Sequence, residues 1–202
     1  MSKRILYIVL SVALAICAGA ASAQQQLSLG QLSQYLNQLQ TAQGGFTQIN
    51  QDGTLSTGQI YIKRPGRIRF EYDPPNDALV MASGGQLAVF DPQSNVPPDR
   101  FPLNQTPLSI ILDSDVDLGS DRMVTDITSD ETSTTITAQD PDNPQYGNIK
   151  LVFTANPTEL RQWIITDEFG TQTTVILNDL VSGEAIRDQQ FNIIAEMRRR
   201  GF

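Results

Sequence analysis

The chain has 202 residues, with 14 basic and 22 acidic side chains and a net charge of -8 at neutral pH. It contains no histidine and one cysteine, which excludes Ser-His-Asp triads, Cys-His nucleophile pairs, imidazole zinc sites and a disulfide scaffold. Phosphodiester backbones and anionic membrane surfaces repel such an acidic chain, so we expect no nucleic acid as a partner.

The first 23 residues have the three-part pattern of a secretory signal peptide. Lys3 and Arg4 precede an apolar run over residues 5–18, and residues 21–23 form an A-x-A cleavage site. The run is shorter than the ~20 residues needed to span a bilayer, which argues against a retained membrane anchor. We therefore expect an exported protein in which residues 24–202 form one domain.

Two amphipathic helices are predicted. A capping box of Ser28 and Gln31 predicts the start of the first, and residues 44–45, both glycine, predict its end. The second is short, with Thr106 as its N-cap and Pro107 at its first helical position. Both helices are expected to cover an apolar surface through these residues: Leu29, Leu32, Leu36 and Leu39 in the first, and Leu108, Ile110, Ile111 and Leu112 in the second.

The remainder shows period-two alternation or short apolar runs separated by turn residues. Turn pairs such as residues 52–53, 65–66 and 169–170 predict hairpins between neighbouring strands. The sequence therefore predicts a mainly β protein with one large antiparallel sheet of about eleven strands, curled or closed like a barrel. The predicted strands are residues 46–50, 59–64, 67–72, 78–82, 87–90, 123–128, 132–138, 149–154, 160–166, 171–177 and 191–194.

Arg64 occupies an unusual position in the strand over residues 59–64. Because strand side chains alternate between faces, Arg64 shares its face with Ile60 and Ile62. One interpretation places it at the rim of the sheet, with its charge reaching water. The other places its five donors over the apolar face, where they would bond the free carbonyl groups of a covering helix or loop. In that case Arg64 would act as a latch on a lid.

The strand after the turn carries the remaining charges of this hairpin. Alternation places Ile68 and Phe70 on the apolar face, and Arg67, Arg69 and Glu71 on the opposite face. Charges on the outer face are expected to pair with acids across the strands or to stay solvated, contributing little to stability.

Two charged segments carry weaker signals. The acidic stretch over residues 113–121 resembles a calcium loop, but Leu118 and Val124 stand where an EF-hand needs glycine and glutamate, so we expect no metal. The three arginines at residues 198–200 are expected to be a frayed chain end.

Four segments carry a resemblance to a known family. They are LGQLSQYLNQLQTAQGGFTQ at residues 29–48, GQIYIKRP at 58–65, RFEYDPP at 69–75 and SGGQLAVFDP at 83–92. In order and spacing they closely resemble the periplasmic outer-membrane lipoprotein carrier family, LolA. The resemblance is specific in the first third of the chain and loose after residue 121. One departure is Phe70, where the family commonly has tryptophan.

The resemblance implies an incomplete antiparallel barrel whose concave apolar face is covered by a helical lid. It implies a periplasmic, non-enzymatic chaperone without a cofactor, expected to be monomeric. Such a chaperone takes acylated lipoproteins from an inner-membrane ABC transporter and delivers them to an outer-membrane receptor. The arginine of the family motif falls on Arg64, its cavity leucine on Leu36 and its apolar residue after the turn on Ile68. With the patterns above, the expected acyl cavity comprises Leu32, Leu36, Leu39, Ile60, Ile62, Ile68 and Phe70; the expected lid and latch comprise Arg64, Pro107, Ile110 and Ile111.

Three alternatives remain open at the level of sequence. The same scaffold can carry or sense another lipid, such as a glycolipid or a fatty acid. A secreted hydrolase would need paired carboxylates, and Asp167, Glu168 and Asp179 each stand beside a turn signal without a defined partner. A purely structural envelope protein would have no apolar cavity. Trp163 alternates with Ile164 as in a core strand, which does not favour a sugar-stacking role.

Overall fold

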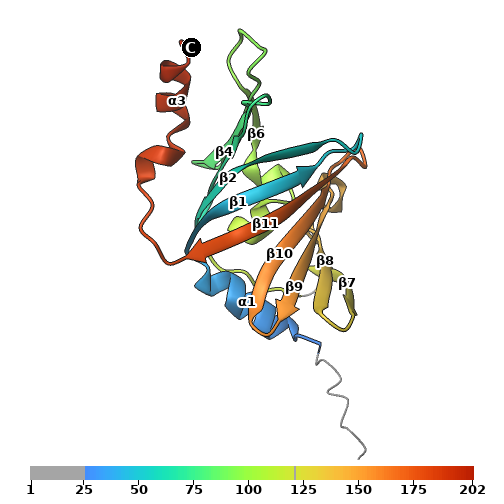
Figure 1. Ribbon diagram of the computed structural model, residues 1–202. Coiled ribbons are helices and arrows are strands. Elements are labelled where there is room, and N and C mark those ends of the chain that lie inside the picture. Colours follow the sequence, from blue (N-terminus) through green and yellow to red (C-terminus); the bar gives the residue numbers. More distant parts are fainter. Residues whose placement is uncertain (1–25, 121) are drawn as a thin grey trace, which may run out of the picture.

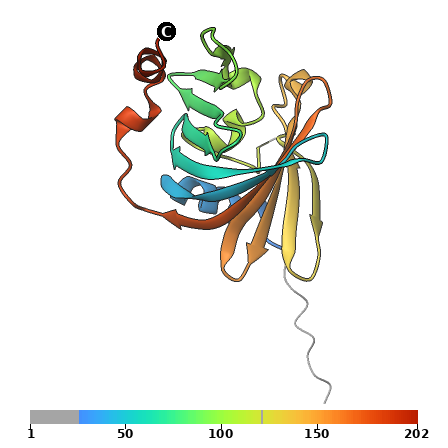
Figure 2. The ribbon, with the colours of Figure 1, turned by 45° about the horizontal axis from the view of Figure 1, so that its top comes forward.

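The computed structural model describes residues 26–120 and 122–202, and the predicted signal peptide lies outside them. These residues form one antiparallel sheet of eleven strands, in the order β6-β5-β4-β3-β2-β1-β11-β10-β9-β8-β7. The two end strands, β6 and β7, do not pair with each other, so the sheet curves without closing (Figure 1, Figure 2). This confirms the predicted fold class. The strands are β1 (Thr41–Ile49), β2 (Leu55–Lys63), β3 (Arg67–Tyr72), β4 (Leu79–Ser83), β5 (Gln86–Phe90), β6 (Asp99–Pro102), β7 (Val124–Ser129), β8 (Ser133–Ala138), β9 (Asn148–Ala155), β10 (Thr158–Thr166) and β11 (Gln172–Ser182).

The chain builds this sheet in two halves. Strands β1 to β6 pair in chain order, strands β7 to β11 do the same, and β11 then pairs with β1 from Ala42↔Ser182 to Ile49↔Thr174. The connection between the halves leaves from one end strand, β6, and returns at the other, β7. This connection therefore has to cross the open side of the curved sheet.

Short helices complete the fold. They are α1 (Leu29–Gln38), α2 (Ser109–Leu112) and α3 (Ile193–Arg199), with 3-10 turns η1 (Leu103–Gln105), η2 (Pro144–Tyr146) and η3 (Asp188–Phe191). The predicted capping box starts α1, since Gln31 N donates to Ser28 Oγ at 3.3 Å and Ser28 N donates to Gln31 Oε1 at 2.9 Å. Within the described ranges, no helix has both the length and the apolar character needed to cross a membrane.

The sheet is covered on both faces. On one face, α1 and α2 form the main hydrophobic core with strands from both halves of the sheet. On the other face, Ile193 and Met197 of α3 pack against Leu79 and Met81 of β4, while the alternate residue Ala82 joins the main core. Figure 1 shows α1 and α3 on different sides of the strands. Strand β4 is therefore buried from both sides.

Four local predictions were wrong. Helix α2 begins at Ser109 after Leu108, so Thr106 is not its N-cap and Pro107 is not its first residue; Thr106 Oγ1 instead donates to the carbonyl oxygen of Leu103 at 2.8 Å. Residues 191–194 form no strand: η3 ends at Phe191 and α3 follows, with Asn192 Oδ1 accepting from Ala195 N at 2.8 Å as its cap. Helix α1 ends at Gln38, and the two glycines expected to end it lie inside β1. Strand β6 was missed because all four of its residues are exposed, so no buried face marks it in the sequence.

One glycine is required by the close approach of two strands. A Cβ atom built on Gly58 would lie 2.1 Å from the carbonyl oxygen of Glu71 and 2.7 Å from the ring of Phe46. Both distances are far below van der Waals contact, so no larger residue fits at this point between β2 and β3. The packing of Phe46 against Phe70, with ring centroids 5.3 Å apart, depends on that approach.

Candidate functional site

The segments that cover the main core form what we call the roof: α1 together with residues 103–118. Polar side chains on α1 bind this second segment, since Leu118 N donates to Ser33 Oγ at 3.0 Å and Val116 N donates to Asn37 Oδ1 at 2.9 Å. Asn37 Nδ2 in turn donates to the carbonyl oxygen of Val116 at 3.0 Å. The two parts of the roof are thus joined by hydrogen bonds through Ser33 and Asn37, neither of which sequence reasoning identified.

The residues expected to form the cavity and its lid all lie beneath or within this roof. Every one of them is buried, and all except Pro107 and Arg64 belong to the main hydrophobic core. They come from two segments of the roof and from strands β2 and β3. The members of this core are Leu32, Leu36, Leu39, Ile60, Ile62, Ile68, Phe70, Ile110 and Ile111.

Arg64 joins the sheet to the roof. Its side chain is 4% exposed, and Nε donates to the carbonyl oxygen of Asp113 at 3.0 Å. Its terminal nitrogens donate to the carbonyl oxygen of Leu36 and, at 3.1 Å, to Asn37 Oδ1. Burial lowers the pKa of Arg64, and the nearby charges of Asp113 and Asp115 oppose that effect. One guanidinium therefore binds both parts of the roof, mostly through backbone carbonyl groups.

A hollow of about 420 Å³ lies beside the roof, between the two halves of the sheet. Its walls come from β3–β6, from η1 and the residues before α2, and from β10–β11, with one residue each from β1 and η2. Of the residues expected to contact a ligand, Phe70 and Pro107 line it, while the others pack in the closed core. The main apolar lining residues are Phe70, Tyr72, Val80, Leu87, Phe101, Pro107, Leu108, Trp163, Ile165, Phe169 and Val175.

Sequence reasoning missed the part of this lining that comes from β10 and β11. The signal was available, because Trp163 and Ile165 share one face of β10 by alternation, and the buried Val175 pairs with Trp163 across the strands. The loose resemblance after residue 121 offered no motif that marked these positions as site residues.

The hollow also has polar lining residues: Gln48, Tyr72, Gln105, Thr106, Tyr146, Asp167, Glu168, Thr171 and Thr173. Tyr72 Oη donates to Gln48 Oε1 at 2.6 Å, and burial raises the pKa of Tyr72 to about 12, so its hydroxyl is neutral at physiological pH. Asp167 and Glu168 lie at the rim, in the turn between β10 and β11, whereas Asp179 borders a different pocket. The three carboxylates considered for a hydrolase are therefore not brought together.

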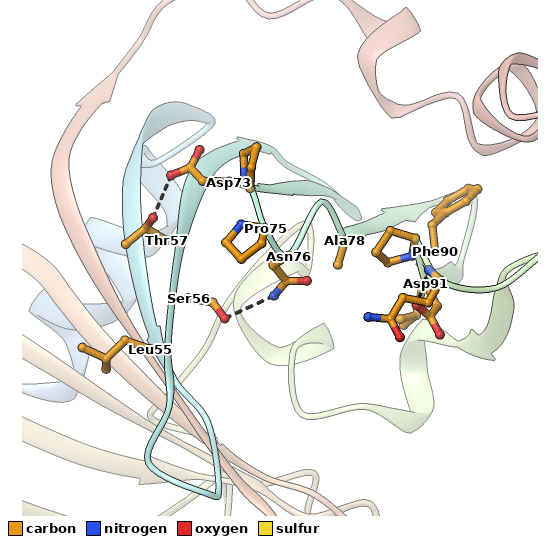
Figure 3. A pocket seen from close by; sticks show the side chains of 13 residues that line it. Leu55, Ser56, Thr57, Asp73, Pro75, Asn76, Ala78, Phe90 and Asp91 are labelled. Atoms are coloured by element: carbon orange, nitrogen blue, oxygen red, sulfur yellow. Dashed lines mark hydrogen bonds between the residues drawn. The ribbon is translucent and has the colours of Figure 1, made fainter.

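A larger and more polar pocket of about 580 Å³ lies between the start of β2, the turn after β3 and the end of β5 (Figure 3). Its polar side chains already bond to one another: Thr57 Oγ1 donates to Asp73 Oδ2 at 2.7 Å, and Asn76 Nδ2 donates to Ser56 Oγ at 3.2 Å. Because it is open and polar, this pocket offers little to an apolar ligand. The hollow beside the roof is the stronger candidate.

Comparison with known proteins agrees with this geometry. The model of the family described as "Outer membrane lipoprotein carrier protein LolA" matches residues 37–194 of the chain. The chain belongs to the LolA family. This confirms the resemblance found in the sequence, and the matched region includes β1 to β11, the hollow and the contacts of Arg64 with Asn37 and Asp113.

Relatives in the LolA family share a modest part of the sequence. The chain is 27% identical over 190 residues to an outer-membrane lipoprotein carrier protein of Pseudomonas aeruginosa strain UCBPP-PA14, covering 89% of each chain. It is 35% identical over 123 residues to one from Coxiella burnetii strain RSA 331, covering 57% of this chain and 58% of that protein. A LolA superfamily crystal structure from Nitrosomonas europaea, NE2245, has 13% identity and a TM-score of 0.45, covering 82% of this chain and 98% of that one. Family membership rests on the family model and the relatives, not on that structure.

Proposed function

We propose that this LolA-family protein carries the acyl chains of lipoproteins through the periplasm, from the inner to the outer membrane. The observation that carries the proposal is the apolar hollow of about 420 Å³ beside a roof that one buried arginine holds to the sheet. Its volume lies within the range of about 300–1,000 Å³ that is usual for small-molecule sites. The carrier names of the relatives support the same assignment.

The roof supports a carrier rather than a permanent lipid store. Burying one acyl chain of ~16 carbons contributes on the order of 12 kcal/mol at ~0.8 kcal/mol per methylene, which would make release very slow. Leu32, Leu36 and Ile111 of the roof pack over the sheet as part of the main core. Since the closed roof competes with the ligand for that surface, closure offsets part of the binding energy and promotes release.

The route follows from the same proposal. After removal of residues 1–23, the domain would contain 12 basic and 22 acidic residues, so the loaded carrier would be repelled by anionic headgroups. It would receive its cargo from an inner-membrane ABC transporter and deliver it to an outer-membrane receptor. We expect it to act as a monomer, without a cofactor and without catalysis.

Binding of a triacylated peptide tests the proposal, with the same peptide lacking acyl chains as a control. Thr173 lines the hollow, and its neighbour Thr174 faces the other side of β11. Thr173→Trp would fill part of the hollow and should weaken binding at least tenfold, whereas Thr174→Trp should leave it unchanged. Circular dichroism on both variants would establish that they are folded.

Two results would contradict this function. One is wild-type affinity in Thr173→Trp, which would mean that the hollow does not hold the chains. The other is failure of the acylated peptide to bind better than its unacylated form. If mass spectrometry of protein recovered from the periplasm shows a glycolipid or a fatty acid instead, the cargo is another lipid on the same scaffold.

A further inference from the structure

Trp163 is the single tryptophan of the chain, and it lies at the boundary between the core and the hollow. It stands in the middle of β10, opposite Leu151 of β9 and Val175 of β11. Its side chain is fully buried, and its ring meets that of Phe70 edge to face, with centroids 6.2 Å apart. Phe70 and Val175 also line the hollow, so a bound molecule would contact this group of residues.

Among residues 26–120 and 122–202, one buried side-chain nitrogen or oxygen has no hydrogen-bond partner. It is the indole nitrogen of Trp163. Buried tryptophan N–H groups usually have an acceptor, and each exception in a folded protein calls for a physical explanation. Its neighbours Leu151, Val175 and Phe70 have hydrocarbon side chains, so they supply no acceptor. The N–H has almost no accessible surface in the closed structure, so an acceptor in the hollow that Trp163 borders reaches it only when the neighbouring side chains move as a chain enters.

We infer that the hollow takes an acyl chain together with its ester or amide carbonyl group, and that the N–H of Trp163 donates to that carbonyl oxygen. This inference rests on the proposed function and narrows the ligand class. An indole N–H is a donor only, so its partner must be an acceptor. A saturated hydrocarbon offers none, whereas the linkage of an esterified or amidated fatty acid offers one at the head of each chain.

The charges around the hollow favour a neutral carbonyl over a free carboxylate. Its lining contains no lysine or arginine within the described part of the chain, and Asp167 and Glu168 stand at its rim. A carboxylate would lose its hydration without gaining a cation and would face two like charges. A neutral ester avoids both penalties. The site should therefore discriminate against free fatty acids.

Two other donors of the lining, Tyr72 and Thr106, already have partners. The hydroxyl group of Tyr72 donates to Gln48 at 2.6 Å, and that of Thr106 donates to the carbonyl oxygen of Leu103 at 2.8 Å. Trp163 thus differs from these two lining residues in having a buried donor without an acceptor. A ligand carbonyl that reaches this donor takes no hydrogen-bond partner away from the protein.

Three ligands of equal chain length test this inference: 1-palmitoylglycerol, its ether analogue 1-O-hexadecylglycerol, and palmitate at pH 7.4. Their affinities are measured by displacement of a fluorescent acyl probe from the full protein. We expect the ester to bind about fivefold to tenfold more tightly than the ether, the ratio expected from one net hydrogen bond, and palmitate to bind more weakly than the ester. In Trp163→Phe the ester and the ether should bind equally, while Ile165→Val, which changes the same wall without removing a donor, should keep the preference.

A second measurement applies even if Trp163→Phe does not fold. The single tryptophan gives one indole N–H signal in nitrogen-15 NMR, and its proton should move downfield with the ester but not with the ether. Equal binding of ester and ether by the wild type, an unmoved indole proton, or a preference that survives in Trp163→Phe would overturn the inference while leaving the carrier function intact. If neither glycerolipid binds, this inference fails, and binding of the triacylated peptide decides whether the proposed function fails with it.

Discussion

Replacing Arg64 by leucine should loosen the roof without unfolding the sheet. Leucine retains apolar volume but makes none of the hydrogen bonds to Leu36, Asn37 and Asp113. These contacts hold the two parts of the roof to the end of β2. Since the main core contains many buried residues that do not touch Arg64, we expect the sheet itself to remain folded.

The size of the effect follows from the contacts of Arg64. When the roof opens, water can solvate both the guanidinium and the freed carbonyl groups. The free energy of roof closure is therefore smaller than the sum of the individual hydrogen-bond energies. We take about 1–3 kcal/mol for the whole buried site, which is the usual effect of removing one partner of a buried polar contact. A change of this size shifts the ratio of closed to open roof by about 5- to 150-fold.

The shift should appear as tighter binding and slower release. A ligand that needs the open roof binds with an apparent affinity reduced by the fraction of open protein, and Arg64→Leu raises that fraction. Release of a fluorescent acyl probe to acceptor vesicles measures the rate, and hydrogen exchange over α1 and α2 measures opening directly. Arg64→Lys keeps the charge but loses the planar fork of donors, so it should fall between wild type and Arg64→Leu.

Arg67→Leu is the matched control for this experiment. It removes the same charge three residues away, where the side chain bonds Asp188 at 2.7 Å and the carbonyl oxygen of Lys63 at 3.2 Å, neither of which belongs to the roof. It should leave probe release and exchange in α1 unchanged. Wild-type release kinetics and wild-type exchange in Arg64→Leu would refute the latch, and so would an equal effect of Arg67→Leu.

Two further predictions concern stability. Burial alone would raise the pKa of Glu196, but hydrogen bonds from Arg199 and Arg200 and the charge of Arg69 lower it below its ordinary value. A carboxyl group with a depressed pKa stabilises the folded state above its unfolded pKa of about 4.3 and loses that contribution as the pH falls through the folded value. The protection of α3 amides, measured relative to their intrinsic exchange rates, should therefore fall below about pH 4, and Glu196→Gln should lower it at pH 7; protection that does not change with pH would contradict this. Gly58→Ala should lower the free energy of unfolding, measured in urea, by about 1–3 kcal/mol through overpacking. Gly30→Ala is the control, because a Cβ atom at Gly30 on helix α1 has open space around it, and it should raise that free energy by about 0.5–1 kcal/mol. An equal effect of the two changes would contradict the packing argument.

The sequence predicted the inner face of the β2–β3 hairpin well because alternation there is regular. Ile60, Ile62 and Ile68 are all buried, and Arg64 lies on their face with 4% exposure. The capping box of α1 was also predictable, since it depends on two residues three positions apart. Such features depend on local spacing, which a single sequence shows directly.

The outer face of the same hairpin was not predicted, because it depends on a distant segment. Arg69 was expected to stay near the surface, yet it is 8% exposed and contacts Glu71 and Glu196 beneath the C-terminal helix. The sequence of β4 contained the signal: Leu79 and Met81 form a second apolar face that alternation requires something to cover. The expected frayed end at residues 198–200 was wrong for the same reason, since Arg199 and Arg200 bond Glu196.

The four basic residues of this hairpin attach different parts of the chain by different physical means. Lys63 and Arg67 pair with Asp188 of η3, whose side chain is 72% exposed, so salt should screen that contact strongly. Arg69 pairs with acids under α3 and is itself largely buried. Arg64 bonds mainly to neutral carbonyl groups of the roof and is also buried, so its contact should depend little on ionic strength. The C-terminal segment and the roof are therefore held by one hairpin yet can loosen independently, because alternation places their anchors on opposite faces.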